Sequence, residues 1–410
     1  MRRGFYTLIA AQFLSALADN ALLLLVIALL QAKNHEAFWI PVIKLMFTLS
    51  YVLAGPWVGA WADNKPKQHV MMQANSIKIM ACLLLLCGIN PVLAFTLTGL
   101  GAAFYAPAKY GLVTELVTSE QLVRANAWIE ISAVCAALFG VMLGGVLVAS
   151  HWINSSIFQM IANYLPADQM FNASMAVLLL IYLFASLVNT QIPDSGRRYE
   201  SAVWTLSSVW NSFVHDQKKL WRDPLGSVSL SVTSLFWGVG ASMQLLVLAW
   251  AQTMLDLNLT QAAYLQAATA VGVIVGAVMA SHLIVIEKAP RVLIAGVLLG
   301  LAIPLMTTIQ DWRWALALTL GLGMLGGFFV VPMNALLQAR GVELLSAGRS
   351  ISVQNTCENS SVLWMLSSYS VLVFFHISVN GLIWALAILI VSGMCLTLWR
   401  YQKITRNTLL

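Results

Sequence analysis

The chain has 410 residues, of which 60% are hydrophobic and only 9% are charged. Soluble globular domains carry about 25% charged residues, so this composition excludes a water-soluble protein. It also excludes a disordered chain, and 5 cysteines are too few for a secreted disulfide-rich scaffold. A membrane-spanning helix needs roughly 20 apolar residues, so a chain of this length has room for about a dozen spans.

The net charge of +6 could indicate a nucleic-acid partner, but in a membrane protein it more often reflects cytoplasmic loops rich in Lys and Arg. No basic patch is interleaved with aromatic residues, so we expect no nucleic-acid partner. The cysteines lie in apolar runs without a CxxC pair, and no histidine lies near a Cys, Asp or Glu at metal-ligand spacing. We therefore expect no metal and no cofactor.

Apolar runs bounded by charged residues, Pro or Gly predict twelve spans, divided six and six by a polar stretch. The first six spans cover residues 5–30, 40–62, 69–90, 92–113, 124–149 and 172–192. The last six spans cover residues 226–251, 260–286, 291–309, 313–337, 351–375 and 379–400. The expected domains are a six-helix bundle over 1–192, a cytoplasmic linker over 193–224 and a second six-helix bundle over 225–410.

The basic residues predict the orientation of the chain. When the N-terminus is placed in the cytoplasm, all but four of the 22 Lys and Arg residues fall on the cytoplasmic side. Lys33 and Arg313 fall in outer loops, and Lys44 and Lys78 fall inside spans. Cytoplasmic loops carry the excess of Lys and Arg, so we expect both termini in the cytoplasm of a multi-pass protein.

The polar stretch between the halves predicts one amphipathic helix, because apolar residues recur in it at helical spacing. The apolar face comprises Val203, Leu206, Trp210, Phe213, Val214 and Leu220, and the polar face comprises His215, Asp216, Lys218 and Lys219. Such a helix either lies on the inner leaflet or links the two bundles.

The two halves of the sequence resemble each other. Pro107 in GAAFYAPAK matches Pro332 in GGFFVVPMN, and NAWIEIS (126–132) is echoed by QNTCENS (354–360). The fourth and fifth spans are therefore repeated in the tenth and eleventh. Duplicated halves around a site near the bilayer midplane are typical of secondary transporters.

The loop after the second span resembles a signature of the major facilitator superfamily, G-x-x-x-D-R-x-G-R-R. GAWADNKPKQ (59–68) matches it at Gly59 and Asp63 and has a basic residue, Lys67, while the other signature positions differ. Gly59 would let two helices approach closely, and Asp63 could cap a helix N-terminus or pair with a base. We expect these three residues to act in gating. The resemblance implies an all-α polytopic fold with twelve spans in two pseudo-symmetric six-helix bundles.

Five further segments, in order along the chain, resemble bacterial lysophospholipid transporters of that superfamily. They are AQFLSALADNALL (11–23), FYAPAKYG (104–111), SLFWGVG (234–240), GGFFVVPMNALLQ (326–338) and VQNTCENS (353–360). The resemblance implies a monomeric inner-membrane flippase for lysophosphatidylethanolamine and related lysolipids, with reacylation by a cytoplasmic acyl-ACP synthetase/acyltransferase. The family often has a basic residue at the start of the LLVL run of the seventh span, where this chain has Gln244.

Polar residues inside the spans are candidate substrate contacts, because a charge at the bilayer centre costs roughly 2.5–3.5 kcal/mol on insertion scales. Gln12, Ser15 and Asp19 recur at i, i+3 and i+7 in the first span, which predicts a polar stripe facing the bundle interior. Asp19, with its neighbour Asn20, would contact a headgroup or a cation. Alternatively, Asp19 would only brace another helix.

Two lysines inside the spans need partners for the same reason. Lys78 in the third span would form an ion pair with Asp19 or Glu130. Lys109, which follows Pro107 in the fourth span, either binds phosphate or is a boundary lysine that reaches back to the interface.

The fifth and eleventh spans carry matching polar pairs at i, i+4. Asn126 and Glu130 form the first pair, and Gln354 and Glu358 form the second. Their shared role is either substrate contact or gating and bonding between helices. Together with Gln244, they complete the set of expected substrate-binding residues.

Two transport functions and one enzymatic function compete. In a lysolipid flippase, Asp19 and Lys109 would compensate the ammonium and the phosphate of the headgroup. In a proton-coupled exporter of amphipathic drugs or other small molecules, Asp19, Glu130 and Glu358 would carry protons. A membrane acyltransferase or lipase would need a nucleophile motif, and the sequence has neither G-x-S-x-G nor H-x-x-x-x-D. We therefore expect a transporter and not an enzyme, with no catalytic residues.

Overall fold

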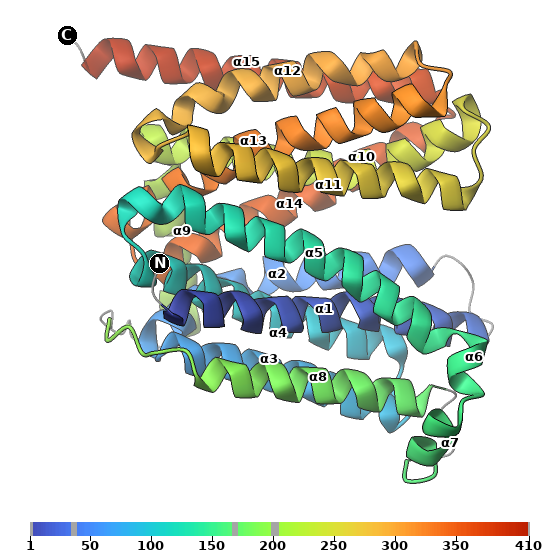
Figure 1. Ribbon diagram of the computed structural model, residues 1–410. Helices are drawn as coiled ribbons and strands as arrows, with labels where there is room; N and C mark the ends of the chain where they lie inside the picture. Colours follow the sequence, from blue (N-terminus) through green and yellow to red (C-terminus); the bar gives the residue numbers. More distant parts are fainter. Residues whose placement is uncertain (1–2, 34–38, 166–170, 198–204, 409–410) are drawn as a thin grey trace. The chain divides into compact units, whose positions relative to one another are not determined.

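The computed structural model describes residues 3–33, 39–165, 171–197 and 205–408, and this part of the chain is built from helices without strands (Figure 1). The first half contains α1 (Arg3–Ala32), α2 (Trp39–Asn64), α3 (Lys67–Leu86), α4 (Pro91–Leu116), η1 (Ser119–Gln121), α5 (Leu122–Val148), α6 (Ser150–Ile153), α7 (Ser156–Ala162) and α8 (Asn172–Thr190). The second half contains α9 (Leu206–Arg222), α10 (Pro224–Met254), α11 (Leu259–Leu283), η2 (Ile286–Val292), α12 (Leu293–Ala302), η3 (Ile303–Thr307), α13 (Trp312–Leu344), α14 (Ala347–Phe374) and α15 (Val379–Thr408). Val203 and the two chain ends, which the sequence analysis also considered, lie outside the described residues.

Within the described residues, 11 helical segments are long and apolar enough to cross a membrane. They fall where the sequence predicts spans, with ends that differ by a few residues. The expected eleventh span corresponds to α14, which has 28 residues and is therefore long enough. It is too polar to meet the same criterion, because it carries Gln354, Asn355, Glu358 and Asn359.

The expected ninth span is not one continuous α-helix but η2, α12 and η3 in succession. Pro290 lies in η2 and Pro304 lies in η3. Proline has no amide hydrogen to donate to the backbone ladder, so the tighter 3-10 turns at both ends are the physical consequence. The short helices α6 and α7 were not expected from the sequence.

Side-chain caps fix where several helices begin. Asn90 accepts a hydrogen bond from the Val92 amide at 2.8 Å, and Pro91 occupies the first helical position of α4. Asp223 caps α10 through the Gly226 amide at 2.7 Å, again with a proline in the first turn. The capping residue supplies an acceptor to an otherwise unsatisfied amide, and proline there loses no backbone bond.

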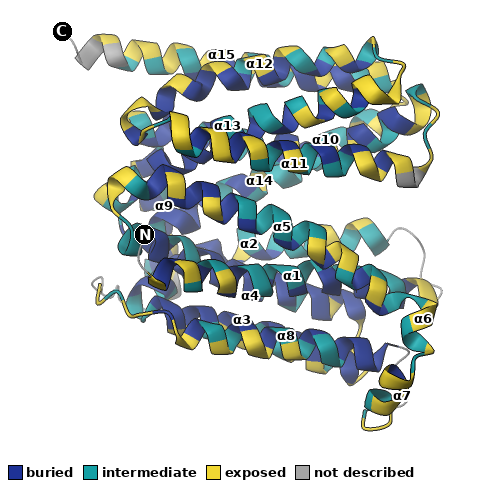
Figure 2. Ribbon diagram, in the orientation of Figure 1, coloured by how far each residue is buried: buried dark blue, intermediate teal, exposed yellow. Residues whose placement is uncertain are grey.

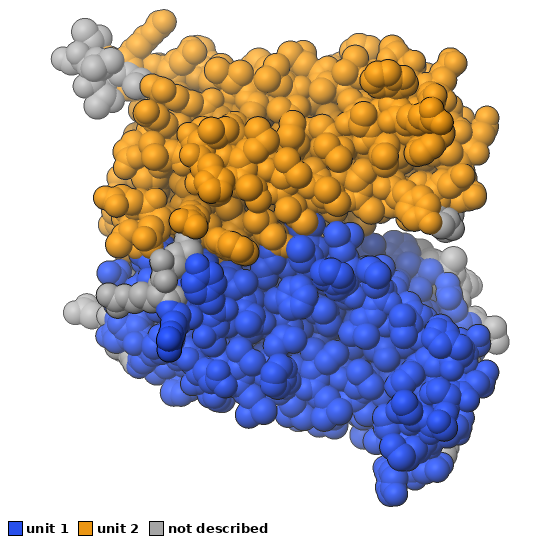
Figure 3. Space-filling view, viewed as in Figure 1, with its two compact units in different colours: residues 1–117, 132–213, 346–355 blue, residues 118–131, 214–345, 356–410 orange. Residues whose placement is uncertain are grey.

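The described chain divides into two compact units, shown in blue and orange in Figure 3. Unit 1 comprises residues 1–117, 132–213 and 346–355, and unit 2 comprises residues 118–131, 214–345 and 356–410. The division cuts through α5, α9 and α14: the start of α5 belongs to unit 2, and the starts of α9 and α14 belong to unit 1. The domain boundaries at 192 and 225 stay a prediction.

Each unit has its own apolar core. In unit 1, Leu22, Leu25 and Phe95 pack with the aromatic ring of Tyr182. In unit 2, the fully buried Trp250 donates its indole N–H to the Met306 carbonyl at 2.8 Å. Exposed positions alternate with buried ones along α11 and α15 (Figure 2). Helices with one face towards lipid and one towards a bundle have this pattern.

Glycines let α11 and α13 approach backbone to backbone. A Cβ added to Gly276 would lie 2.0 Å from the Met324 carbonyl oxygen, and one added to Gly323 would lie 2.0 Å from the Thr269 carbonyl oxygen. Gly272 on α11 is equally close to α13. Small residues spaced four apart are typical of tightly packed spanning helices.

The helix expected between the two halves is present as α9, but its buried face differs from the expected one. Val209, Phe213 and Leu220 are buried, as is the acidic Asp216. Trp210, expected on the apolar face, is 52% exposed. The spacing of the four buried positions defines a single helix face, so Asp216 belongs to the packed side and Trp210 lies beside it.

Candidate functional site

A polar stripe on α1 organises the first cluster of unit 1. Gln12 and Ser15 are buried and Asp19 is partly buried, so the stripe faces other helices as the i, i+3, i+7 spacing predicts. Asp19 Oδ2 lies 2.6 Å from Lys78 Nζ on α3, and Tyr182 of α8 donates its hydroxyl to Asp19 Oδ1 at 2.7 Å. The expected ion pair of Lys78 is therefore made with Asp19.

Lys78 is held by more than its counter-ion. It donates to Ser15 Oγ at 2.9 Å, and Ser15 donates to Asn75 Oδ1 at 2.9 Å. Asn75 and Lys78 lie three residues apart on α3, on the face that meets α1. Asp19 and Ser15, both on α1, therefore fix the ammonium group in position, and Asn75 in turn holds Ser15.

The two members of this pair differ in accessibility. The side chain of Asp19 is 15% exposed, whereas that of Lys78 is 2% exposed. A carboxylate has about four acceptor positions on its two oxygens, and Lys78 and Tyr182 take only one each. Asp19 therefore keeps acceptor capacity and is the more exposed member of the pair, while Lys78 is enclosed.

Lys109 on α4 lies at the other end of the α1 stripe. It donates to Gln12 Oε1 at 3.1 Å, and the Gln12 amide donates to Ser132 Oγ on α5 at 2.8 Å. Its ammonium also lies 4.2 Å from the centre of the Tyr110 ring. Unit 1 thus carries a cation and an acceptor-rich carboxylate along one stripe.

A second cluster in unit 1 joins the last turn of α2, to which Asp63 belongs, to the start of α14. Asp63 accepts hydrogen bonds from the amides of Gly348 at 2.9 Å and Arg349 at 3.1 Å, and also from the Ser346 hydroxyl. It therefore caps the N-terminus of α14, where the helix dipole favours a negative charge. A Cβ on Gly59 would lie 2.7 Å from Ser352 Cβ, so glycine permits this close approach.

Lys67 extends this cluster into a buried charge network. Its ammonium lies 2.7 Å from Glu115 of α4 and 3.8 Å from Asp63, and both the Lys67 and the Glu115 side chains are almost fully buried. Glu115 also accepts a hydrogen bond from the Ser195 hydroxyl at 2.5 Å. The pairing and the hydrogen bonds offset much of the desolvation free energy that burial of these charges costs.

Four of the expected substrate residues belong to unit 2. Asn126 exchanges two amide hydrogen bonds with Gln338 of α13, at 2.8 and 2.9 Å. Glu130 and Glu358 are buried, and Gln244 is exposed. The Asn126 geometry bonds two helices within the unit, which is one of the two roles left open for it.

The remaining two expected substrate residues belong to unit 1. Asn20 lies where α1 meets α5, because a Cβ on Gly140 would be 2.7 Å from Asn20 Cβ, and its amide donates to the Ala16 carbonyl at 2.8 Å. Gln354 is buried on the first part of α14.

Unit 2 has a charge cluster of its own between α10 and α13. Arg340 donates to both oxygens of Asp223, at 3.2 and 2.5 Å. Burial alone would raise the pKa of Asp223, but the hydrogen bonds from Arg340 and the Gly226 amide outweigh it and hold that pKa below its ordinary value. The two charges therefore tie the start of α10 to the end of α13.

The family model of the Major Facilitator Superfamily matches residues 8–366 of the chain. The chain belongs to the major facilitator superfamily. The fold expected from the sequence, an all-helical polytopic protein with two pseudo-symmetric bundles, is confirmed. Pro107 of α4 and Pro332 of α13 each lie in the fourth spanning segment of their half, as the repeat predicts.

Curated relatives in this superfamily align over almost the whole chain. The lysophospholipid transporter LplT of Shigella flexneri is 38% identical over 98% of this chain and 96% of its own. The protein of the same name from Escherichia coli O7:K1 gives the same values. The resemblance drawn from the five motifs is therefore confirmed.

Solved structures of other transporters share the fold at low sequence identity. A bacterial homologue of the iron transporter ferroportin, in an outward-facing state, is 18% identical with a TM-score of 0.73, covering 99% of this chain and all of the other. The human organic anion transporter MFSD10 is 14% identical with a TM-score of 0.72, covering 98% of this chain and all of the other.

Several residues of these clusters were not expected from the sequence. Tyr182 is a single tyrosine in an apolar span, so no periodic pattern marks it. Asn75 could have been found, because it lies three residues before Lys78 on the same face. Glu115 and Ser195 lie at the end of a helix and in a loop, where only the folded chain brings them to Lys67.

Proposed function

We propose that the protein is a lysophospholipid transporter that moves lysophosphatidylethanolamine and related lysolipids across the bacterial inner membrane to the cytoplasmic leaflet. There an acyl-ACP synthetase/acyltransferase would reacylate them. Both termini would lie in the cytoplasm, on the side that the Lys and Arg residues favour. Support comes from curated lysophospholipid transporters that are 38% identical over 98% of the chain.

The observation that carries the proposal is the accessible carboxylate of the buried Asp19–Lys78 pair. An ammonium leaving water needs a carboxylate partner, and a phosphate needs donors. Asp19 offers the remaining acceptor positions, and Lys109 with Gln12 offers donors along the same stripe. A zwitterionic headgroup would meet complementary groups at both of its charges.

Lys78 has a different task in this proposal. It supplies Asp19 with a counter-ion when no headgroup is present, because a lone buried charge is costly. The ammonium of the substrate would then join the existing network of Asp19 and Lys78, and it would not have to serve as the only counter-ion of Asp19. This explains why the enclosed member of the pair is the cation.

The transport cycle would be alternating access, with Asp63 at its gate. Asp63 caps α14 in the conformation described here, and Gly59 and Lys67 complete that contact. Release of the cap would free α14 for the other conformation. A small number of hydrogen bonds at one helix end can set such an equilibrium, because a bias of 1–2 kcal/mol changes a population ratio about 5- to 30-fold.

A double-substitution cycle tests the role of Asp19. Asp19→Asn removes the carboxylate that would bind the headgroup, so uptake of labelled lysophosphatidylethanolamine into proteoliposomes should fall about 10- to 150-fold, which corresponds to a charge-assisted hydrogen bond of about 1.5–3 kcal/mol. The single variant also leaves Lys78 buried without its counter-ion, so it should lose thermal stability.

The double variant Asp19→Asn, Lys78→Gln separates the two effects. Removing both charges should restore much of the thermal stability, because no lone buried charge remains. Uptake should stay low if Asp19 contacts the headgroup. Recovery of uptake in the stable double variant would instead make Asp19 a structural counter-ion and remove it from the substrate site.

A further inference from the structure

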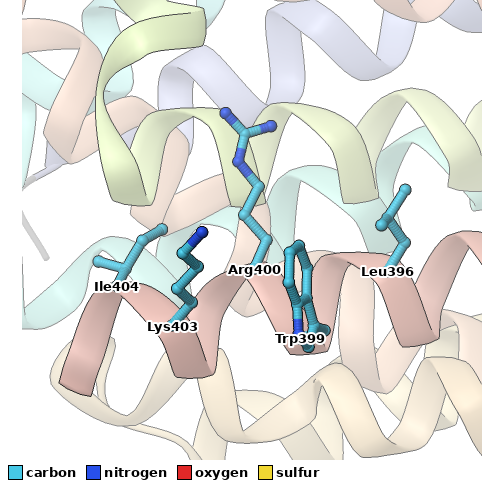
Figure 4. A pocket seen from close by; sticks show the side chains of 5 residues that line it. All are labelled: Leu396, Trp399, Arg400, Lys403 and Ile404. Carbon is cyan, nitrogen blue, oxygen red and sulfur yellow. The ribbon is translucent and has the colours of Figure 1, made fainter. Parts of the chain in front are cut away.

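A groove with two cations lies at the end of α15, outside the clusters described above. Its volume is about 480 Å³, and its walls come from the last part of the helix (Figure 4). Leu396, Trp399, Arg400, Lys403 and Ile404 line it. Two of these five residues are cations and none is acidic, so the groove favours a negatively charged occupant.

The lining residues share one face of α15. Their spacing of three, four, seven and eight residues from Leu396 is that of a single helical stripe. In Figure 4, Arg400 and Lys403 project to the same side of the helix. Arg400 donates one N–H to the Trp221 carbonyl at 3.5 Å, which orients the guanidinium, and an arginine has five N–H donors in all.

Apolar and aromatic groups flank the cations in a definite order. Leu396 is 64% exposed and Trp399 is 59% exposed. Lys403 Nζ lies 5.4 Å from the centre of the Trp399 ring. Along the helix axis the order is therefore an exposed aliphatic group, then an aromatic group, then two cations.

This order matches the layers of a lipid leaflet. The apolar segment that ends at Ile404 is long enough to span a membrane. Tryptophan favours the boundary between the acyl chains and the headgroups, and basic groups at a helix end lie among the headgroups. In the orientation proposed above, this end of α15 faces the cytoplasmic leaflet, whose anionic lipids attract basic side chains.

We propose that this groove binds a diacyl phospholipid with a net negative headgroup from the cytoplasmic leaflet. The phosphate would accept hydrogen bonds from Arg400 and Lys403, and an acyl chain would lie against Leu396. A zwitterionic lipid fits less well, because its ammonium would meet two cations and no carboxylate of the lining. This bound lipid is separate from the transported lysolipid, and the assignment depends only on the proposed orientation.

Native mass spectrometry of the purified full chain with added phosphatidylglycerol or phosphatidylcholine tests this site, without any measurement of transport. The unaltered protein should bind phosphatidylglycerol at least about tenfold more tightly than phosphatidylcholine. The double variant Arg400→Gln, Lys403→Gln should bind it roughly 30-fold more weakly, the factor that about 1 kcal/mol for each of two cations gives. Equal binding of the two lipids by the unaltered protein would overturn the proposal.

Matched variants separate the groove from general surface charge. Lys288→Gln with Arg291→Gln removes two exposed cations of unit 2 that do not line the groove, and this variant should bind as the unaltered protein does. Because Arg400 also bonds to Trp221, Lys403→Gln alone serves as the milder variant. An equal loss in the control pair would show that binding follows net charge and not this site.

The variant Leu396→Gln and a competition experiment with glycerol phosphate test the proposed contact between the acyl chain and Leu396. The variant should weaken the binding of phosphatidylglycerol, and free glycerol phosphate should not displace the lipid at equal concentration. Displacement by glycerol phosphate, with no effect of Leu396→Gln, would assign the groove to a soluble phosphate compound and reject the lipid.

Discussion

Asp63, one of the three gating residues expected from the sequence, makes several interactions through one carboxylate. Its carboxylate accepts from two amides of α14 and one hydroxyl, and it lies 3.8 Å from Lys67. Asp63→Asn keeps an acceptor oxygen but removes the charge that favours the helix N-terminus, which is worth about 0.3–2 kcal/mol there. We expect the transport rate to fall up to about 30-fold, and the free energy of unfolding to fall by no more than about 2 kcal/mol.

Uptake of labelled lysolipid and labelling of engineered cysteines by a membrane-impermeant thiol reagent would measure this effect. Asp256→Asn is the matched control, because Asp256 is an exposed aspartate in the connection before α11. It also has a positive φ of 51°, which asparagine tolerates well. Unchanged uptake and labelling in a folded Asp63→Asn variant would remove Asp63 from the gate.

At the scale of elements, the packing of α11 on α13 depends on glycine. A Cβ at Gly323 would lie 2.0 Å from a carbonyl oxygen of α11, whereas a Cβ at Gly321 on the same helix would have no atom of another helix or loop within 4 Å. Gly323→Ala should therefore destabilise the protein by about 1–3 kcal/mol, because the helices must separate. Gly321→Ala should be neutral or stabilising by up to about 1 kcal/mol, because alanine has the higher helix propensity. Thermal unfolding of the two variants in detergent decides this, and equal transition temperatures would contradict the packing argument.

How well each helix could be predicted depends on what determines its position in the chain. The long spans were predictable because each needs a continuous apolar run, and even the polar α14 was placed by the charged residues and loops around it. The break of the ninth span at its prolines, and the short α6 and α7, depend on local turns that hydropathy does not record. The face of α9 was mispredicted at Asp216, because burial of a charge depends on tertiary partners.

The residues of the candidate site were likewise predictable only where a local sequence pattern marks them. The stripe of Gln12, Ser15 and Asp19 came from helical periodicity, and the pairing of Lys78 came from the cost of a charge in lipid. Tyr182 and Glu115 join these clusters only through the three-dimensional arrangement of distant spans. A single sequence read by itself offers no pattern that would connect these residues to the clusters.

For the whole molecule, the two transport mechanisms differ in their energy source. If reacylation consumes the lysolipid in the cytoplasm, mass action draws the flux inward without an ion gradient. We therefore expect uptake of labelled lysophosphatidylethanolamine into spheroplasts with an active acyltransferase to persist after an uncoupler is added. In proteoliposomes, an imposed proton gradient should change the initial rate by less than about twofold. Loss of uptake with the uncoupler, while the acyltransferase stays active, would favour the proton-coupled exporter with Glu130 and Glu358 as carriers.

The polarity of α14 has a consequence for how the chain is made. A helix that carries Gln354, Asn355 and Glu358 gains little free energy when it moves by itself from the translocon into the bilayer. Charged residues at a helix centre cost roughly 2.5–3.5 kcal/mol each. Earlier segments that offer polar partners must already be in the bilayer, and the apolar α15 must follow to hold the hairpin in place. We therefore expect insertion of α14 to depend on the order of synthesis, and a nascent chain released before α15 emerges to leave α14 outside the membrane.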